Sequence, residues 1–390
     1  MEKETINKDL INIVGLDRVR FITDIESISV NTFIANKGYI TYSCNDDNKY
    51  TIVNNDDSKN ISFDSLRYKV EISTFNKTSD RTIYEVKTIS YNSHRRIAVD
   101  IVLGRYKYGT KHNAYVVNAE EVKELMEQLH GELLEIGLGL KSPNTWTISY
   151  IELNKTIESD KPLLYYDRAL TWLLECVYGS IDDNIHISTD RTKYKKAQSL
   201  TYTIHWDYKN DNRIDSIYSK TEQIKQSLDI VLDGNLIRFE SKYSDKEIIN
   251  TFGTYNAYEI LATKLEKLFN GSVQHIADIV NKSIETDIQY YYELLERPNV
   301  SSIDNLYRTQ HSDIFDIVIM LEAIRRKYKD NNNSHFSRDI NISILKGIDT
   351  KEQYNYESLV DILTAFYPKV KLFKFNKSVM KYSTKNNANN

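Results

Sequence analysis

Three short segments alternate polar, mostly ionisable residues with apolar ones, namely TWTISYIELN, RIDSIYSKT and NLIRFESKY at residues 145–154, 213–221 and 235–243. Residues two positions apart on a β-strand share a face. We therefore expect Glu152 to face away from the apolar side of the first strand. Tyr218 and Lys220 share one face of the second strand. Arg238 and Glu240 share one face of the third.

If these strands are neighbours in one sheet, their exposed polar face carries chemistry that suits phosphodiester transfer. Glu152 and Glu240 are the kind of carboxylate pair that holds Mg²⁺ or Mn²⁺ while leaving positions for phosphate oxygens. Tyr218 is a candidate nucleophile, because a nearby cation such as Lys220 lowers the cost of ionising a phenol whose ordinary pKa is about 10. A plainer interpretation stays open. A tyrosine on a strand is usually structural, and Arg238 beside Glu240 is typical of a cross-strand ion pair.

Composition limits the classes of function open to the chain. Its 390 residues include 51 basic and 55 acidic side chains, giving a formal net charge of −4, so a polyanion would have to bind a local basic patch. Cys44 and Cys176 lie far apart and indicate neither a zinc finger nor a disulfide scaffold, which makes the reducing cytoplasm the expected compartment. We find no secretion signal and no run of about 20 apolar residues, and therefore expect no membrane partner.

The elements that would position the candidate residues predict an α+β fold. Residues 19–103 alternate apolar and polar positions over short runs, which is typical of antiparallel strands and hairpins. Helical spacing follows at 118–140, where Asn118 is a candidate N-cap, and again in the more apolar segment 163–178. With a further strand at 199–208 and the three polar strands, this order predicts a mostly antiparallel central sheet with helices on one face.

The chain changes character after about residue 250. Amphipathic helices are expected at 255–269, 273–296, 313–329 and roughly 352–366. We therefore expect one α+β domain over residues 1–250, in which a strand-rich part (1–96) precedes a second part (97–250). A mainly helical domain over 251–376 and a frayed tail at 377–390 would follow.

Between about residues 97 and 260, these segments follow an order known from one protein family. IAVDIVLGRYKYG (97–109) suggests a strand and a tight turn, with Lys107 and Gly109 ahead of Asn113, and a helix at 118–134 then leads into TISYIELN. The strand SLTYTIHWDY, the strand that bears Tyr-x-Lys and the strand GNLIRFESKY come next. Together they resemble the replication initiators of the gene II/X family of filamentous phages and related plasmids, which are rolling-circle nicking enzymes.

The resemblance implies roles for the residues singled out above. Tyr218 would be the nucleophile that forms a 5′-phosphotyrosyl link to DNA and frees a 3′-hydroxyl for a polymerase, and Lys220 would assist it. Glu240 and the acid at position 152 would contribute to the metal site, while Arg238 would stabilise charge on the phosphate or pair with Glu240. The sequence departs from the family at two positions, because Glu152 replaces the usual Asp and Tyr150 replaces the usual Arg.

The metal must be held by carboxylates, because none of the eight histidines forms the His-hydrophobe-His motif of other rolling-circle initiators. The expected cofactor is therefore Mg²⁺ or Mn²⁺ on Glu152 and Glu240. His205 is the one histidine expected on a neighbouring strand, and a lone histidine is more often structural.

An enzyme of this kind would bind double-stranded and single-stranded origin DNA in the host bacterial cytoplasm, with a host helicase and polymerase as further partners. The candidate DNA contacts are the basic residues Arg105, Lys107, Lys111, Lys193, Lys195 and Lys196. Two other classes remain open. The chain would be an origin-binding protein without nicking activity if Tyr218 only contacts DNA, or a non-enzymatic phage structural protein if the sheet face is merely polar.

Overall fold

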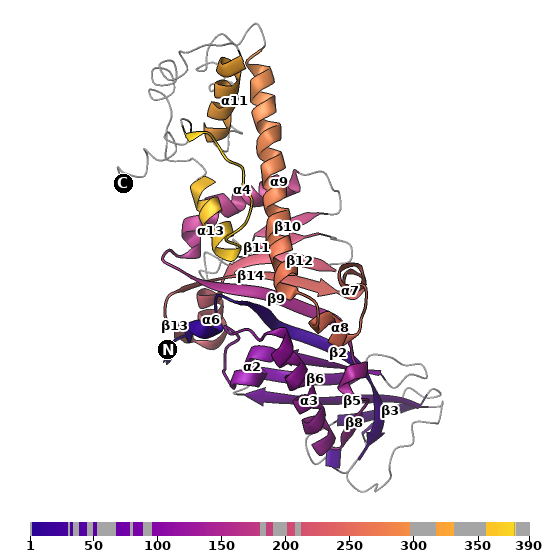
Figure 1. Ribbon diagram of the computed structural model, residues 1–390. Coiled ribbons are helices and arrows are strands. Elements are labelled where there is room, and N and C mark those ends of the chain that lie inside the picture. The colour runs from indigo at the N-terminus through magenta and orange to yellow at the C-terminus, as the bar shows by residue number, and fades with distance from the viewer. Residues whose placement is uncertain are drawn as a thin grey trace. The chain divides into compact units, whose positions relative to one another are not determined.

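A computed structural model gives the fold in three dimensions. It describes residues 2–29, 32–33, 39–44, 50–52, 68–78, 81–88, 96–179, 185–189, 201–206, 212–296, 317–330, 356–377 and 379. The fold is α+β, with a mostly antiparallel sheet and a helical C-terminal region, as the sequence predicts (Figure 1). No helix in these ranges combines the length and the apolar surface that a membrane span requires.

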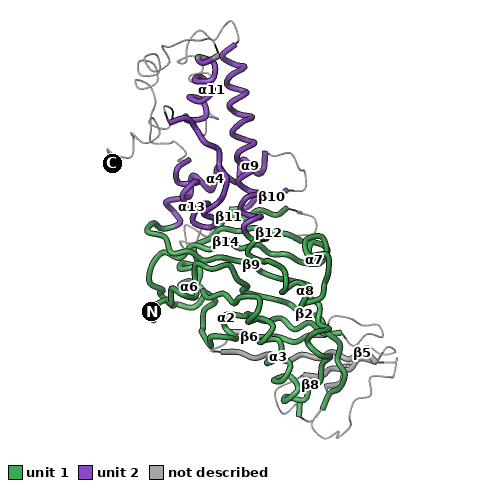
Figure 2. The backbone as a smooth tube through the Cα atoms, viewed as in Figure 1, with its two compact units in different colours: residues 1–162, 189–269 green, residues 163–188, 270–390 purple. Residues whose placement is uncertain are grey.

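The chain divides into two compact units, shown in separate colours in Figure 2. Unit 1 comprises residues 1–162 and 189–269, and unit 2 comprises residues 163–188 and 270–390. This division differs from the single boundary expected near residue 250. The reason is that α4 (Asp167–Tyr178), from the middle of the chain, packs with α13 (Tyr356–Phe366) from its end.

Antiparallel pairing dominates the sheet of unit 1. In spatial order its strands are β11 (Thr201–His205), β12 (Arg213–Ser219), β14 (Asn235–Ser244), β9 (Thr147–Ser159), β2 (Val14–Ile28), β7 (Arg96–Val102), β6 (Arg81–Thr88), β5 (Tyr68–Thr78), β3 (Tyr39–Cys44) and β4 (Tyr50–Ile52). The short β8 (Leu138–Leu140) also pairs with β2. The three polar strands expected from the sequence are thus β9, β14 and β12, and they lie side by side with β2 as the next neighbour.

One face of this sheet is apolar and packs on helices. α3 (Ala119–Glu135) starts with a capping box, in which Asn118 and Glu121 each accept the other's backbone N–H, and this confirms the predicted N-cap. Apolar side chains of α3 and α8 (Ala257–Leu261) form one core with those of β2, β7 and β9. Ile151 and Leu153 belong to this core, so Glu152 between them faces the other side of the sheet.

β2 is irregular where it passes the centre of the sheet. Two of its residues, Asp17 and Arg18, stand opposite a single residue of β9, Glu152. This β-bulge re-aims the side chains around it and places both residues beside the polar face. A Cβ atom at Gly15, just before the bulge, would lie 2.7 Å from Cγ2 of Val116, so a glycine there lets the segment ending at Val117 lie against β2.

A second apolar cluster covers one end of the polar face. It joins α6 (Lys220–Leu228) and β13 (Ile230–Leu232) to the segment that contains Ala114 and Tyr115. Leu236 belongs to the same cluster and lies on the same face of β14 as Arg238 and Glu240. The expectation of an exposed polar face is therefore wrong, because its polar residues are buried and this cluster packs over one end of it. β1 (Glu2–Glu4) pairs with β13 of the same cluster.

Three helices differ from the sequence-based expectation. Residues 103–108 form α2 (Leu103–Tyr108), in place of a strand end and a turn. α6 begins at Lys220, which is therefore the first helical residue and not part of the strand with Tyr218. α9 (Leu265–Leu294) continues through Gly271, whereas the sequence predicted separate helices at 255–269 and 273–296. α11 (Ile317–Asp330) and α13 match expected helices.

Candidate functional site

Three carboxylates from neighbouring strands converge on the polar face of unit 1. Asp17 of β2, Glu152 of β9 and Glu240 of β14 each bring an oxygen atom within 4.8 Å of the others. Their exposed fractions are only 2, 7 and 4%. The sequence predicted that Glu152 and Glu240 would meet, and the structure brings them together and adds Asp17. We call these three residues the carboxylate cluster.

Buried like charges repel one another, so the carboxylate cluster needs cations or protons beside it. Lys242 Nζ lies 2.8 Å from Glu240 Oε1, and Arg238 Nη1 lies 2.8 Å from Asp17 Oδ2. Within the described part of the chain, Glu152 makes no ion pair, and its carboxylate instead accepts a hydrogen bond from the Tyr150 hydroxyl. One of the three acids is thus left without a paired cation.

Buried atoms without partners mark the same place. Among the described residues, Asp17 Oδ1 and both polar side-chain atoms of Asn154 have no hydrogen-bond partner. Asn154 lies on the same face of β9 as Glu152 and stands directly opposite Glu240 on β14. Buried polar atoms normally find partners, so Asp17 Oδ1 and Asn154 Oδ1 are two further oxygen atoms that can bind an ion. Carboxylate and amide oxygens are the ligands that Mg²⁺ and Mn²⁺ prefer, so the residues present fit such an ion.

The carboxylate cluster divides into acids of different pKa. Burial, followed by the charges of Glu240 and Asp17, raises the pKa of Glu152 to about 8. Burial also opposes ionisation of Glu240, but Lys242 and Arg238 outweigh it, and the pKa of Glu240 lies below its ordinary value. At neutral pH the cluster therefore holds a proton on Glu152 that a divalent cation would displace.

Tyr218 points at this cluster. Its hydroxyl donates a hydrogen bond to Glu240 Oε2 at 2.9 Å, and the residue is 7% exposed. β12 carries Tyr218 directly opposite Arg238 of β14, which fixes the direction of the ring. Burial and the charge of Glu240 raise the pKa of Tyr218 well above the usual value for a phenol.

Lys220 lies beside Tyr218, but as the first residue of a helix and not as a residue of the same strand. Ser219 caps α6 by accepting the N–H of Glu222, and as the first residue of that helix Lys220 is fully buried. Its Nζ lies 5.5 Å from the centre of the Tyr218 ring and donates to Gln223 Oε1 at 2.8 Å. Burial and the charge of Arg238 lower the pKa of Lys220 to about 7, so the amine is only partly protonated near neutrality.

The guanidinium group of Arg238 donates hydrogen bonds to four protein oxygen atoms. Nε donates to Thr156 Oγ1 at 2.8 Å, and Nη2 donates to the carbonyl oxygens of Asn113 and Ala114 at 2.8 and 2.7 Å. Nη1 donates to Asp17, so the ion-pair partner is Asp17, where the sequence suggested Glu240. Arg238 thus orients a carboxylate and ties the segment after α2 to the sheet.

Tyr150 lies beside two arginines from β2. The guanidinium carbons of Arg18 and Arg20 lie 5.9 and 5.7 Å from the centre of its ring. Both arginines also pair with Asp100 of β7, at 2.6 and 2.9 Å. Positive charge is therefore present beside position 150, although a different strand supplies it.

The residues expected to contact DNA are dispersed or fall outside the described residues. Lys193, Lys195 and Lys196 lie outside the ranges that the structure describes. Arg105 and Lys107 belong to α2, and Lys107 pairs with Glu121 at the start of α3. Lys111 follows that helix. The structure does not bring these three into the carboxylate cluster.

His205, the single histidine considered as a ligand, stands opposite Ile214 on β12. Tyr218 stands opposite Thr201, so four residues of β11 separate His205 from the row of Tyr218, which corresponds to about 13 Å along a strand. His205 is not part of the carboxylate cluster.

The sequence analysis missed Asp17 and Lys242, and it placed Asn154 on the face of Glu152 without giving it a role. Lys242 and Asn154 each lie two residues beyond an acid that was identified, on β14 and β9. The alternating pattern therefore predicts that they share the face of that acid. Asp17 gave no such signal, because it reaches the site through a β-bulge and an alternating pattern does not reveal bulges.

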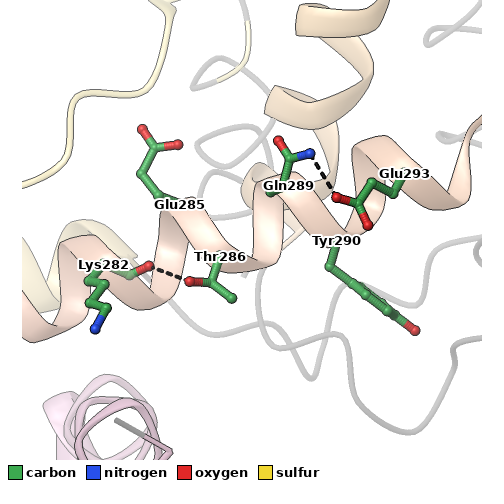
Figure 3. A pocket seen from close by; sticks show the side chains of 6 residues that line it. All are labelled: Lys282, Glu285, Thr286, Gln289, Tyr290 and Glu293. Carbon is green, nitrogen blue, oxygen red and sulfur yellow. Dashed lines mark hydrogen bonds between the residues drawn. The ribbon is translucent and has the colours of Figure 1, made fainter.

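A hollow in unit 2 is distinct from these residues. Its lining comes from one side of α9 and consists of Lys282, Glu285, Thr286, Gln289, Tyr290 and Glu293 (Figure 3). Gln289 donates to Glu293 at 2.9 Å, and Glu285 pairs with Arg326 of α11 at 2.8 Å. We assign no site to the hollow, because several of its polar groups already pair within the protein.

We compared the chain with known protein families and with curated proteins. No model of a known protein family matches the chain, and no curated protein matches its sequence.

Proposed function

We propose that the chain is a metal-dependent DNA nicking and closing enzyme that initiates rolling-circle replication with Tyr218 as its nucleophile. The observation that carries the proposal is the 2.9 Å contact between the Tyr218 hydroxyl and Glu240, a member of the carboxylate cluster. A phenol aimed at a set of acids suited to a divalent cation is the arrangement that phosphodiester transfer to tyrosine needs. Replication and origin DNA enter through the family resemblance of residues 97–260.

Each residue has a defined part in the proposed reaction. The Tyr218 oxygen forms a bond to phosphorus while the bond from phosphorus to the 3′ oxygen breaks, and that oxygen leaves as a hydroxyl after taking a proton from water. Glu240, which already accepts the phenolic hydrogen bond, orients the hydroxyl, and the proton of Tyr218 passes to water as the bond to phosphorus forms. Lys220, when protonated, stabilises the phenolate across the ring face.

A divalent ion on the carboxylate cluster would neutralise charge on the phosphate oxygens. Arg238 holds Asp17 in place, and Asn154 offers an amide oxygen beside Glu240. The phosphotyrosyl bond conserves the energy of the broken phosphodiester, so the reverse transfer can close the circle after a polymerase has extended the free 3′ end. Since Tyr218 and the acids are buried in the free protein, the proposal requires their cover to open when DNA binds.

One observation favours a second candidate function. Tyr218 is almost completely buried and its pKa is raised, and both properties oppose nucleophilic attack. In that case Tyr218 is a structural partner of Glu240, and the chain is an origin-binding protein without nicking activity.

A supercoiled plasmid that carries the DNA flanking the chain's own gene separates the two functions. The nicking enzyme requires Mg²⁺ or Mn²⁺ to relax the plasmid and leaves a covalent protein–DNA adduct, which Tyr218→Phe abolishes. Tyr258→Phe is the matched control, because it too removes a hydroxyl bonded to a carboxylate, that of Glu127, which lies outside the cluster, and it retains the adduct. A band shift without adduct in the unaltered protein would support the second function.

A further inference from the structure

An exposed pair of arginines lies beside the carboxylate cluster and has no role in the reaction described above. We propose that Arg18 and Arg20, held against Tyr150 by Asp100, bind a backbone phosphate of the DNA strand next to the one at the carboxylate cluster. This phosphate site rests on the proposed function, since a DNA strand is what would bring phosphates there. The test of this site measures DNA affinity, whereas nicking is measured by formation of the covalent adduct.

The two guanidinium groups are fixed by a shared aspartate. Arg18 Nε and Nη2 donate to the two oxygens of Asp100 at 2.6 and 2.8 Å. Arg20 Nε and Nη2 both donate to Asp100 Oδ2, at 3.1 and 2.9 Å. Two positive charges thus share one negative charge, and the group keeps a net charge of about +1 at neutral pH.

The arginines remain accessible to a ligand. Their side chains are 43 and 44% exposed, whereas that of Asp100 is 12% exposed. Within the described residues no hydrogen bond engages Nη1 of Arg18 or of Arg20. Guanidinium groups hydrogen-bond phosphate oxygens readily and are the preferred side chains for this purpose.

Tyr150 connects this pair to the carboxylate cluster. Arg18 and Arg20 lie over its ring at 5.9 and 5.7 Å, and its hydroxyl bonds to Glu152. The phosphate site is therefore one side chain away from the cluster. The bulge in β2 produces this proximity, because it sends Asp17 to the carboxylate cluster and the next residue, Arg18, to the Tyr150 ring.

The ordinary alternative is a surface ion network that contributes little to stability or binding. A matched network lies further along β2, where Asp24 pairs with Arg96 of β7 at 3.6 Å and with Lys141, the residue after β8, at 2.7 Å. Those side chains are 58 and 48% exposed, and Asp24 lies four residues beyond Arg20, or about 13 Å along the strand. The control network has the same charge but lies outside the reach of a phosphate beside Tyr150.

The test compares two double variants of the full chain, Arg18→Gln with Arg20→Gln and Arg96→Gln with Lys141→Gln. The probe is a fluorescent single-stranded oligonucleotide of mixed sequence, titrated over a series of salt concentrations. Loss of one phosphate contact flattens the slope of log affinity against log salt by about 0.7 and weakens binding at low salt by about tenfold. We expect this from the first double variant and not from the second.

Asp100→Asn gives an independent reading. It removes the negative charge that the arginines share, so DNA binding is expected to become tighter and steeper in its salt dependence. Thermal melts identify any variant that fails to fold. The phosphate site would be overturned if the unaltered protein and the first double variant had equal salt slopes. An equal loss of DNA affinity in both double variants would overturn it too. Absence of an adduct from the unaltered protein, with affinity still lost on changing Arg18 and Arg20, would instead refute nicking alone.

Discussion

At the scale of single residues, the proposed chemistry depends on three buried acids. Asp17 and Glu240 each have a cationic partner, and among the described residues Glu152 has none. A buried acid without a cation keeps its proton, and this agrees with the raised pKa of Glu152. Metal binding at this place must therefore release a proton, which can be measured.

The first prediction concerns pH and metal affinity. Since the pKa of Glu152 is about 8 in the folded protein, Mn²⁺ has to displace its proton below that pH. Affinity is expected to rise about tenfold per pH unit from about pH 6 to pH 8 and to level off above it. Calorimetric titrations at several pH values check this, and Glu152→Gln is expected to bind Mn²⁺ more weakly with a flatter pH profile. An affinity independent of pH would contradict the assignment.

The same pKa shift has a defined sign for stability. Because the pKa of Glu152 is raised on folding, the metal-free folded state binds more protons than the unfolded state between about pH 4.5 and 8. The stability contributed by Glu152 is therefore full below about pH 4.5 and is lost as the pH rises through 8. Added divalent cation is expected to restore it.

A second prediction concerns Arg238. Arg238→Met leaves Asp17 buried without its cation and is expected to lower the free energy of unfolding by about 3–5 kcal/mol. Combining it with Asp17→Asn removes both charges, so the double variant is expected to lose less than the sum of the single losses. Urea unfolding measures the cycle. Arg20→Met is the exposed control and should cost less than about 1 kcal/mol, and additive losses at Arg238 and Asp17 would disprove the coupling.

At the scale of elements, alternation predicted the faces of β9, β12 and β14 but not what covers them. The strands and their polar residues follow directly from a period of two, which is a local property. The cover comes from α6 and the segment near Ala114, which approach through contacts distant in sequence. The bulge at Asp17 likewise depends on pairing between β2 and β9, so no single segment encodes it.

The start of α6, in contrast, had a local signal that alternation obscured. The sequence Ser219-Lys-Thr-Glu222 has the spacing of a capping box, and the Ser219 side chain does accept the N–H of Glu222. The pattern RIDSIYSKT also suits a strand up to residue 221. Ser219 is both the last residue of β12 and the N-cap of α6. Lys220 is therefore the first residue of the helix, and this position buries its amine beside Tyr218.

The third prediction tests the continuity of α9. Gly271 is inside this helix, and a Cβ atom there would meet nothing within 4 Å, so Gly271→Ala is expected to stabilise the protein by about 1 kcal/mol. Gly253 also has open space around it but has a φ of 73°, where alanine is strained, so Gly253→Ala is expected to cost about 1–2 kcal/mol. Thermal unfolding compares them, and destabilisation by Gly271→Ala would indicate that α9 breaks there.

At the scale of the whole molecule, helices and strands that are neighbours in the sequence do not always belong to the same compact unit. The sequence predicted a boundary near residue 250 because the composition becomes helical there. Unit 2 also includes residues 163–188, whose apolar helix α4 was predicted correctly but assigned to the sheet domain. Trp172 of α4 contacts Tyr356 of α13 with ring centres 6.2 Å apart, and a pairing across so many residues leaves no trace in local composition.

The last prediction follows from that grouping. A fragment of residues 1–269 keeps α4 but lacks α13, so the side chains that α4 buries lose their cover, namely Ala169, Leu170, Trp172, Leu173, Leu174, Cys176 and Val177. Each large side chain among them forfeits about 1.5–3 kcal/mol of burial, and we expect aggregation and strong binding of a hydrophobic dye. Replacing residues 163–188 of the fragment by a Gly-Ser linker of equal length removes the uncovered helix and should restore a soluble unit 1. Equal solubility of the two fragments would show that α4 belongs with the sheet after all.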